Sequence, residues 1–439
     1  MAADVDLPGL HVHDPEFYPY LLQSTSRDGR LGRYDILFAN PEQSLVLNHH
    51  GELEGPFSDR ADRFLDALDQ WHASEQGAGG PAPFSGGWFL YLGYELAGEI
   101  EDTLRLSDDT QLPVAFATRC RAAIIRDHVR NETRLVTEAG VPSTVLDRIR
   151  SDVEAEQSPP DSGVSIVSIR EDEPGFFLDA VASAKARIDY GDIYQANLSR
   201  SWHATIGEGT SPATVYRALC EANPAPFAGL ARFGDTSIIS SSPERLVCVR
   251  EGVVATRPIA GTRPRSADVA VDGDLSAELL THPKERAEHV MLIDLERNDL
   301  GRICKPGSVS VDEMMVIETY AHVHHIVSNV SGTLDDDVTP GDIIRAVFPG
   351  GTITGCPKVK CMEIIASLER APRGAYTGSF GYLNCDGSLD LNILIRTMVQ
   401  HNDELTLRAG AGIVADSVPN AELEETRAKA KGLLAALGS

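Results

Sequence analysis

The chain has 439 residues, of which 42% are hydrophobic and 24% charged, and its formal net charge is −26. This composition is typical of a soluble globular protein with a large core. The negative charge, which no basic patch offsets, disfavours nucleic acid and membrane surfaces as partners. Seven scattered cysteines without a Cys-x-x-Cys pair, no signal peptide and no long apolar run favour a cytoplasmic location.

The first third of the chain predicts strands mixed with helices. Two strands are expected around a polar Arg27-Asp28-Gly29 turn, followed by a helix from about Asp59 to Trp71. An apolar strand is expected within residues 87–101. Residues 113–137 predict a hairpin, because apolar and polar side chains alternate there.

A polar segment at 152–163, which contains a Pro-Pro pair, is the best candidate for a domain boundary. We therefore expect an N-terminal region at 1–152, a linker at 153–174 and a C-terminal region at 175–439. Strands and helices do not alternate regularly, which favours an α+β sandwich over a doubly wound sheet. The elements expected in the C-terminal region are helices at 176–189, 282–297 and 419–437, strands at 191–205 and 406–417, three strand-like runs in 228–262, and a hairpin at 378–399 with an Asp386-Gly387 turn.

A glycine-rich segment at 348–363 is a candidate ligand site. Glycine lets the backbone approach a ligand closely, threonine hydroxyls can hold carboxylate oxygens, and a following helix directs its positive end at them. The segment therefore predicts a cradle for a small anion, although a glycine-rich turn before an ordinary helix has the same pattern. Its residues of interest are Gly350, Gly351, Thr352, Thr354, Gly355 and Lys358, and the helix is expected from Val359 to Leu368.

Two predicted helices each carry a Glu-x-x-Glu pair, formed by Glu285 with Glu288 and by Glu422 with Glu425. Residues three apart share one face of a helix, so two such helices could enclose a hard cation. Magnesium prefers oxygen ligands and keeps some of its waters, which leaves room for a carboxylate of a substrate. In a chain this acidic, the same pattern also describes ordinary solvated helix faces.

Other side chains are suited to proton transfer. His322, His324 and His325 form a cluster, but no cysteine or fourth ligand lies at a spacing that fits zinc. One inward histidine that acts as a hydrogen-bond donor or acid/base is the better interpretation. Glu244 lies at the start of a predicted strand, where it could protonate a leaving group if its surroundings raise its pKa. A surface ion pair is the competing interpretation for Glu244.

Seven motifs in a fixed order extend this picture. They are SSPER, RPIAGTRPR, KERAEHVMLIDLERNDLGR, HVHHIVS, FPGGTITGCPKVKCMEII, GYL with IRT, and AGAGIVADSVPNAELEET. Their order resembles the chorismate-binding enzymes, a family that includes the first components of anthranilate synthase and aminodeoxychorismate synthase and the isochorismate and salicylate synthases. The strong resemblance covers about residues 175–435, and a looser one to the two amine-using members covers residues 15–150.

The resemblance implies two facing, largely antiparallel sheets with outer helices, Mg²⁺ as cofactor, and chorismate, a cyclohexadiene with two carboxylates, as substrate. Glu288 and Glu425 match the family's magnesium ligands, with Glu285 and Glu422 beside them. Glu244 matches the acid that helps the C4 hydroxyl to leave, and His325 matches a histidine beside the ring. Positions that match contacts with the ring, the enolpyruvyl carboxylate or the glycine loop are Thr352, Thr354, Lys358, Tyr382, Arg396, Gly410 and Gly412.

The nucleophile implied by the resemblance depends on Gln195. The water-using members resemble one another in carrying a lysine as general base at this position, and a glutamine cannot deprotonate water. Ammonia is therefore the expected nucleophile. Ammonia-using members usually pair with a glutamine amidotransferase. Because this chain lacks a Gly-x-Cys-x-Gly nucleophile turn, we expect the glutaminase to be a separate subunit that forms a heterodimer with it.

Two amine-using functions fit the motifs. The segment RYDILFANP at 33–41, Gly350 and Gln23 favour aminodeoxychorismate synthase component I, which makes 4-amino-4-deoxychorismate for 4-aminobenzoate and folate. PIAGT, ETYAHVHHIVSNV and VADSVPNAELEET favour anthranilate synthase component I, which makes anthranilate and pyruvate. Ala260 is the sharpest conflict, because well-studied aminodeoxychorismate synthases resemble one another in having a nucleophilic lysine there, and alanine cannot attack. We expect the first function and keep the second as the alternative.

Overall fold

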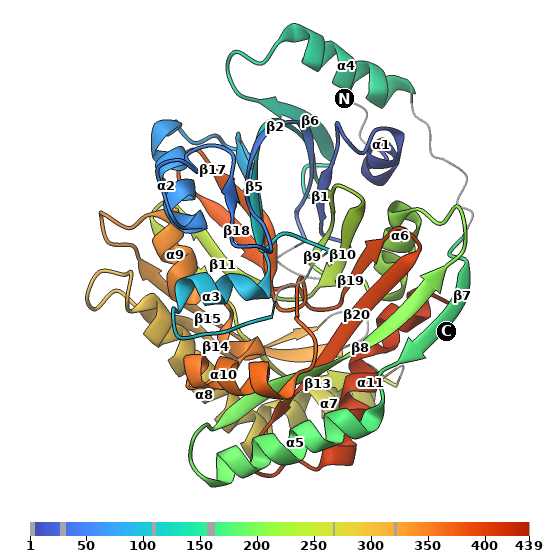
Figure 1. Ribbon diagram of the computed structural model, residues 1–439, viewed down its shortest axis with the longest axis vertical. Coiled ribbons are helices and arrows are strands. Elements are labelled where there is room, and N and C mark those ends of the chain that lie inside the picture. Colours follow the sequence, from blue (N-terminus) through green and yellow to red (C-terminus); the bar gives the residue numbers. More distant parts are fainter. Residues whose placement is uncertain are drawn as a thin grey trace.

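The computed structural model describes residues 5–26, 32–107, 111–155, 163–266, 268–319 and 323–438. Within these ranges, helices surround a long set of paired strands (Figure 1). No helix in the described ranges is both long and apolar enough to cross a membrane.

The strands pair side by side in one continuous sheet, which we call the ladder. Every pairing between the described strands is antiparallel. The order is β7-β8-β20-β19-β10-β9-β1-β2-β5-β4-β17-β18-β11-β12-β15-β14, with β16 beside β8, β3 beside β2, β6 beside β5 and β13 beside β15. The bounds are β1 (Tyr20–Gln23), β2 (Tyr34–Leu47), β3 (Leu53–Glu54), β4 (Gly87–Leu92), β5 (Ala115–Asp127), β6 (Glu132–Thr137), β7 (Ile166–Glu171), β8 (Gln195–Ile206), β9 (Phe227–Phe233), β10 (Thr236–Ser242), β11 (Arg245–Arg250), β12 (Val253–Thr256), β13 (Ile259–Pro264), β14 (Ser310–Thr319), β15 (Val323–Thr333), β16 (Gly355–Cys356), β17 (Ser379–Asn384), β18 (Leu389–Asn392), β19 (Thr397–His401) and β20 (Glu404–Ile413).

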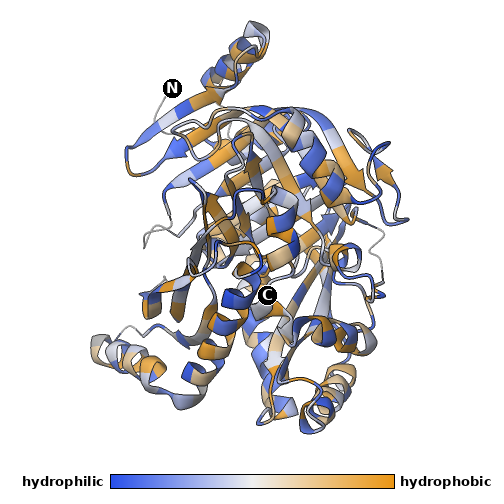
Figure 2. Cartoon of the chain, turned by 90° about the vertical axis from the view of Figure 1, so that its left-hand side faces the viewer, coloured by the Kyte–Doolittle hydropathy of each residue, from blue (hydrophilic) through white to orange (hydrophobic). Residues whose placement is uncertain are grey.

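The helices lie on the outside of the strands (Figure 1). Hydrophilic and hydrophobic residues alternate along them (Figure 2), as expected for helices that turn one face to a core and the other to water. The bounds are α1 (Leu7–His13), α2 (Phe64–Ser74), α3 (Ala97–Ile100), α4 (Ser143–Ala155), α5 (Pro174–Asp189), α6 (Pro212–Ala222), α7 (Val269–Thr281), α8 (Pro283–Leu300), α9 (Pro340–Val347), α10 (Lys358–Leu368) and α11 (Pro419–Ala436), with short 3₁₀ turns η1 (Tyr94–Leu96) and η2 (Gly351–Ile353).

An aromatic core lies where distant parts of the ladder face each other. Tyr20 of β1 stacks on Phe89 of β4 with 4.0 Å between ring centroids. A Cβ at Gly229 of β9 would lie 2.6 Å from the ring of Phe380 on β17, so these two strands meet closely across the core. The predicted α+β class with facing antiparallel sheets is therefore confirmed, and the facing sheets are parts of one ladder.

The N-terminal strands belong to the same ladder as the C-terminal ones. β1 pairs with β9, and β4 pairs with β17. The division into regions at 1–152 and 175–439 stays a prediction, and residues 156–162 of the expected linker lie outside the described residues.

Most predicted elements are present with small shifts in their bounds. The hairpin around Asp386-Gly387 is β17–β18, and the last helix ends at Ala436, just before Gly438 at a φ of 78°. The helix expected from Asp59 begins only at Phe64, where the carboxylate of Glu99 accepts a hydrogen bond from the N–H of Leu65. The predicted Arg27-Asp28-Gly29 turn lies outside the described residues.

A buried ion network holds α10 against the sheet. Glu369, directly after the helix, pairs with Arg373 at 2.7 Å and with Arg408 of β20 at 2.9 Å. It also accepts hydrogen bonds from the N–H and hydroxyl of Ser199 in β8. Burial alone would raise the pKa of Glu369, but the two guanidinium groups hold it below its ordinary value.

We expect Glu369→Ala to lower the free energy of unfolding by about 3–5 kcal/mol, because it leaves two buried guanidinium groups without their carboxylate. Urea denaturation measures this loss. Glu363→Ala on α10 is the matched control, since its ion pair with Lys360 is exposed and is worth about 1 kcal/mol or less. Equal shifts of the two denaturation midpoints would contradict a stabilising role for the network.

Candidate active site

Glu244 lies between β10 and β11 and is almost fully buried. Its Oε1 accepts a hydrogen bond from the Thr352 hydroxyl at 2.9 Å. Burial raises the pKa of Glu244 to about 7, against the opposing hydrogen bonds from Thr352 and the N–H of Ile259. The glycine loop therefore meets Glu244 through Thr352. A carboxyl group that is protonated up to neutral pH can act as a general acid.

Arg396 and His325 lie in the same electrostatic environment. The Arg396 guanidinium has no hydrogen-bond or ion-pair partner among the described residues. Burial lowers its pKa, whereas the charges of Glu244 and Glu425 raise it. Burial, together with Arg396, lowers the pKa of His325 to about 4, so this imidazole is neutral at pH 7. A partly buried cation with no partner beside a neutral imidazole is suited to a carboxylate ligand.

The glycines of β20 bring β8, α8 and α11 together. Gln195 of β8 donates from Nε2 to Oε1 of Glu288 at 3.3 Å. A Cβ at Gly412 would lie 2.7 Å from that nitrogen. The carbonyl of Gly410 accepts a hydrogen bond from Lys429 at 3.0 Å, and Lys429 pairs with Glu425 at 2.7 Å. Side chains from both Glu-x-x-Glu helices therefore lie around this strand.

The four glutamates differ in their surroundings. Glu285 pairs with Arg263 at 3.2 Å, and Glu422 is buried. Among the described residues, no group of three or more His, Cys, Asp or Glu is close enough to hold a metal ion. Mg²⁺ commonly uses only one or two carboxylates, completed by water and substrate oxygens. Glu288, whose Oε1 would lie 3.9 Å from a Cβ at Gly412, and Glu425, whose partner Lys429 donates to the carbonyl of Gly410, supply one carboxylate each for such a donor set.

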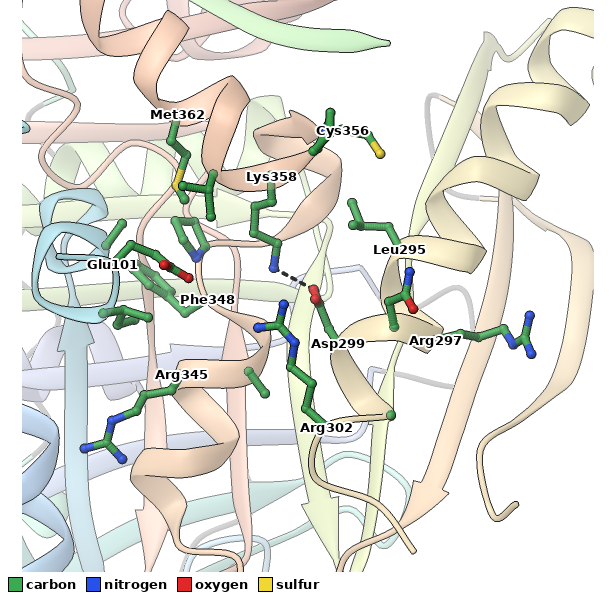
Figure 3. Close-up of a pocket in the computed structure, with 18 residues that line it drawn as sticks. Glu101, Leu295, Arg297, Asp299, Arg302, Arg345, Phe348, Cys356, Lys358 and Met362 are labelled. Atoms are coloured by element: carbon green, nitrogen blue, oxygen red, sulfur yellow. Dashed lines mark hydrogen bonds and ion pairs between the residues drawn. The ribbon is translucent and has the colours of Figure 1, made fainter. Parts of the chain in front are cut away.

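Lys358 and Thr354 bond to groups other than Glu244. Lys358 donates to Asp299 of α8 at 2.5 Å and lines a cavity of about 600 Å³ with Arg302 and Phe348 (Figure 3). The Thr354 hydroxyl donates to the carbonyl of Gly350 at 2.9 Å, so it stabilises the loop itself. Of Thr352, Thr354 and Lys358 in the predicted anion cradle, only Thr352 therefore contacts Glu244.

Tyr382 does not lie with the predicted site residues, and its expected place there is corrected. Its ring packs against Phe84 with 5.9 Å between centroids, and burial and the charge of Asp390 raise its pKa. Tyr376 takes the expected position, because its hydroxyl would lie 2.7 Å from a Cβ at Gly410. Arg396 also acts on the pKa of Tyr376. Nothing in the sequence pattern distinguishes Tyr376 in advance.

The remaining predicted positions are structural in character. Ala260 of β13 is buried opposite Ile326 of β15 and offers no nucleophile. His324 contacts Asp272 at 3.0 Å and Thr319 at 2.9 Å, which accounts for both ring nitrogens without a metal. His322 lies outside the described residues.

The sequence reasoning missed Lys429 and Asn197. Lys429 lies four residues after Glu425 on α11, a spacing that places the two on one helix face and could have pointed to their ion pair. Asn197 lies two residues after Gln195 in β8, so it shares the strand face of Gln195.

Comparisons with known proteins identify the family of this chain. The profile of the family described as chorismate binding enzyme matches residues 18–435. An anthranilate synthase component I-like protein of Synechocystis sp. is 45% identical over 361 residues, which are 81% of this chain and 73% of that protein. Aminodeoxychorismate synthase component 1 of Bacillus subtilis is 41% identical over 368 residues, 81% of this chain and 77% of the relative. The crystal structure of anthranilate synthase component I from Streptococcus pneumoniae matches with a TM-score of 0.83 at 32% identity, over 92% of this chain and 93% of that chain.

The fold and the site define an enzyme with a buried acid, an arginine suited to a carboxylate, and glutamates from two helices. The chain belongs to the family of chorismate-binding enzymes. It is a chorismate-utilising enzyme of the anthranilate synthase and aminodeoxychorismate synthase type, since its relatives carry both names.

Proposed function

We propose that this chain is component I of aminodeoxychorismate synthase, which converts chorismate and ammonia into 4-amino-4-deoxychorismate and water. The observation that supports amination most directly is the amide of Gln195, which donates to Glu288 and offers no base for water. The choice of the 4-amino product is supported by the segment at 33–41 and by Gly350.

The proposed reaction uses the described side chains in distinct roles. Arg396 binds one carboxylate of chorismate as a charge-assisted pair. Glu244 gives its proton to the C4 hydroxyl, so the C–O bond breaks and water leaves. Ammonia forms the new C–N bond at C4 and then loses a proton, which returns through solvent to the Glu244 carboxylate. His325, neutral because of its low pKa, is beside the ring as a hydrogen-bonding group.

The proposal includes Mg²⁺, with Glu288 and Glu425 as its protein ligands. When bound, the cation would neutralise the ring carboxylate and draw electron density from the ring. Glu285 is tied to Arg263 and Glu422 is buried, so we assign these two glutamates to supporting the ligands. A separate glutamine amidotransferase that supplies ammonia completes the proposed enzyme.

The alternative is anthranilate synthase component I, and one observation favours it. Ala260 is buried and apolar, so this chain has no nucleophile at the position where a covalent route to the 4-amino product would need one. Under our proposal, ammonia therefore adds directly or another group takes the place of that nucleophile.

The products made from chorismate with Mg²⁺ and ammonium salt distinguish the two functions. We expect a non-fluorescent product that a separate aminodeoxychorismate lyase converts to 4-aminobenzoate. Ammonium replaces the glutaminase in this assay, and EDTA is the control for the metal. Rising anthranilate fluorescence with release of pyruvate would contradict the proposal and establish the alternative.

A further inference from the structure

Two amide side chains cover the glycines of β20. Gln195 and Asn197 are alternate residues of β8, so their side chains point to the same side of the strand. They are only 4% and 9% exposed. A Cβ at Gly412 would lie 2.7 Å from Nε2 of Gln195, and a Cβ at Gly410 would lie 2.7 Å from Oδ1 of Asn197. The absence of side chains at Gly410 and Gly412 therefore makes the space that the two amides occupy.

Each of these amides has an oxygen without a hydrogen-bond partner. Oε1 of Gln195 and Oδ1 of Asn197 are buried and accept no hydrogen bond from the described residues. Glu288 accepts from the nitrogen of Gln195, which fixes that nitrogen toward the carboxylate and leaves the oxygen for another donor. Buried acceptors are normally satisfied, so two orphaned oxygens on one strand face point to a ligand that donates.

The chemistry of the two substrates identifies that ligand. The carboxylates of chorismate only accept hydrogen bonds, and its hydroxyl is assigned to Glu244 in the proposed reaction. Ammonia is small and carries several N–H donors. Alternate Cα atoms of a strand are about 6.6 Å apart, roughly two hydrogen-bond lengths of about 2.9 Å each, so one molecule of ammonia can contact both oxygens.

We propose that Gln195 and Asn197 together form the ammonia-binding subsite, in which two amide oxygens accept N–H groups and orient the nitrogen lone pair toward the substrate ring. The inference rests on the proposed function and deepens it, because it names Asn197 as a second residue that contacts the nucleophile. Both oxygens act only as acceptors, which favours a nucleophile rich in N–H donors.

The test is steady-state kinetics of Asn197→Leu, which removes the acceptor at similar size, with the concentration of free NH₃ varied at fixed pH. We expect the KM for ammonia to rise roughly 3- to 10-fold, the worth of one hydrogen bond. We expect the KM for chorismate and the kcat at saturating ammonia to stay near the wild-type values. Asn197→Ala, which also removes the acceptor and is smaller, serves if the leucine variant does not fold.

Gln400 offers a matched control. It is a buried amide on β19, two strands from β8, and its Oε1 also lacks a partner among the described residues. Gln400→Leu imposes a similar structural change away from the glycines of β20. We expect it to leave both KM values unchanged, which separates loss of the subsite from general damage to the sheet.

The outcomes separate this inference from the proposed function. Wild-type enzyme that consumes no chorismate with ammonium would contradict the amination itself, and the subsite with it. If the wild-type enzyme is active but the Asn197 variants have a higher KM for chorismate alone, or no change in either KM, the subsite is overturned. The proposed amination would still stand. A rise in the KM for ammonia alone supports the subsite.

Discussion

Replacing Glu244 with glutamine is expected to lower kcat/KM for chorismate by roughly 10²- to 10⁴-fold, the usual contribution of a general acid. Glutamine keeps the size of the side chain and can still accept the hydrogen bond from Thr352. It has no acidic proton to give to the leaving hydroxyl. The loss should therefore appear in turnover while the fold is kept, as circular dichroism and thermal unfolding can check.

The pH dependence gives a second measure of the same group. Burial raises the pKa of Glu244 to about 7, and the acid acts only when it is protonated. The sign follows directly: kcat/KM should be level below that pKa and fall about tenfold per pH unit above it. Because ammonium loses its proton as the pH rises, the concentration of free NH₃ must be held constant across the profile by adjusting total ammonium.

Glu296 is the matched control for this profile. It is also buried, and burial together with the nearby Asp299 raises its pKa to about 7. Glu296→Gln should keep the alkaline fall, and Glu244→Gln should remove it from the residual activity. If the fall disappears with Glu296→Gln instead, the titrating acid of the reaction is not Glu244.

Local patterns in the sequence predicted the parts of the site that neighbouring residues determine. The glycine loop, the two Glu-x-x-Glu helices and the strand that carries Gln195 depend on residues close in the chain, and the structure has each of them. The high pKa of Glu244 could not be predicted, because it results from burial in the folded chain, against hydrogen bonds from Thr352 and Ile259 in other segments. Likewise, the direction of Lys358 depends on Asp299, which lies 59 residues away.

The error at Tyr382 has a structural cause. All residues of β17 are buried, so both faces of this strand lie against protein. The alternation of side chains then tells which residues share a face but not which face meets a ligand. Tyr382 shares its face with Phe380 and belongs to the aromatic core. Tyr376 lies before the strand, where no periodic pattern indicates its direction.

Replacing Glu288 or Glu425 with glutamine is expected to lower Mg²⁺-dependent kcat/KM by roughly 10²-fold or more, because a catalytic metal supplies several kcal/mol and each 1.36 kcal/mol is a factor of ten. A neutral amide is a weaker ligand than a carboxylate for a hard cation. The Mg²⁺ concentration for half-maximal rate should therefore rise, and calorimetric titration with Mg²⁺ should show weaker binding without any turnover.

Each variant has a control on its own helix. Glu424→Gln on α11 removes an exposed carboxylate that pairs with Arg427, and Asp294→Asn on α8 removes one that pairs with Arg297. Neither borders the β20 glycines, so neither should change the Mg²⁺ dependence. Glu288→Gln also alters the acceptor of Gln195, whereas Glu425→Gln leaves that contact intact. A near-full rate at low Mg²⁺ in both glutamine variants would therefore contradict the assignment of magnesium to these two residues. Loss of activity in Glu288→Gln alone would show that Glu288 acts by holding the amide of Gln195 and not by binding the metal.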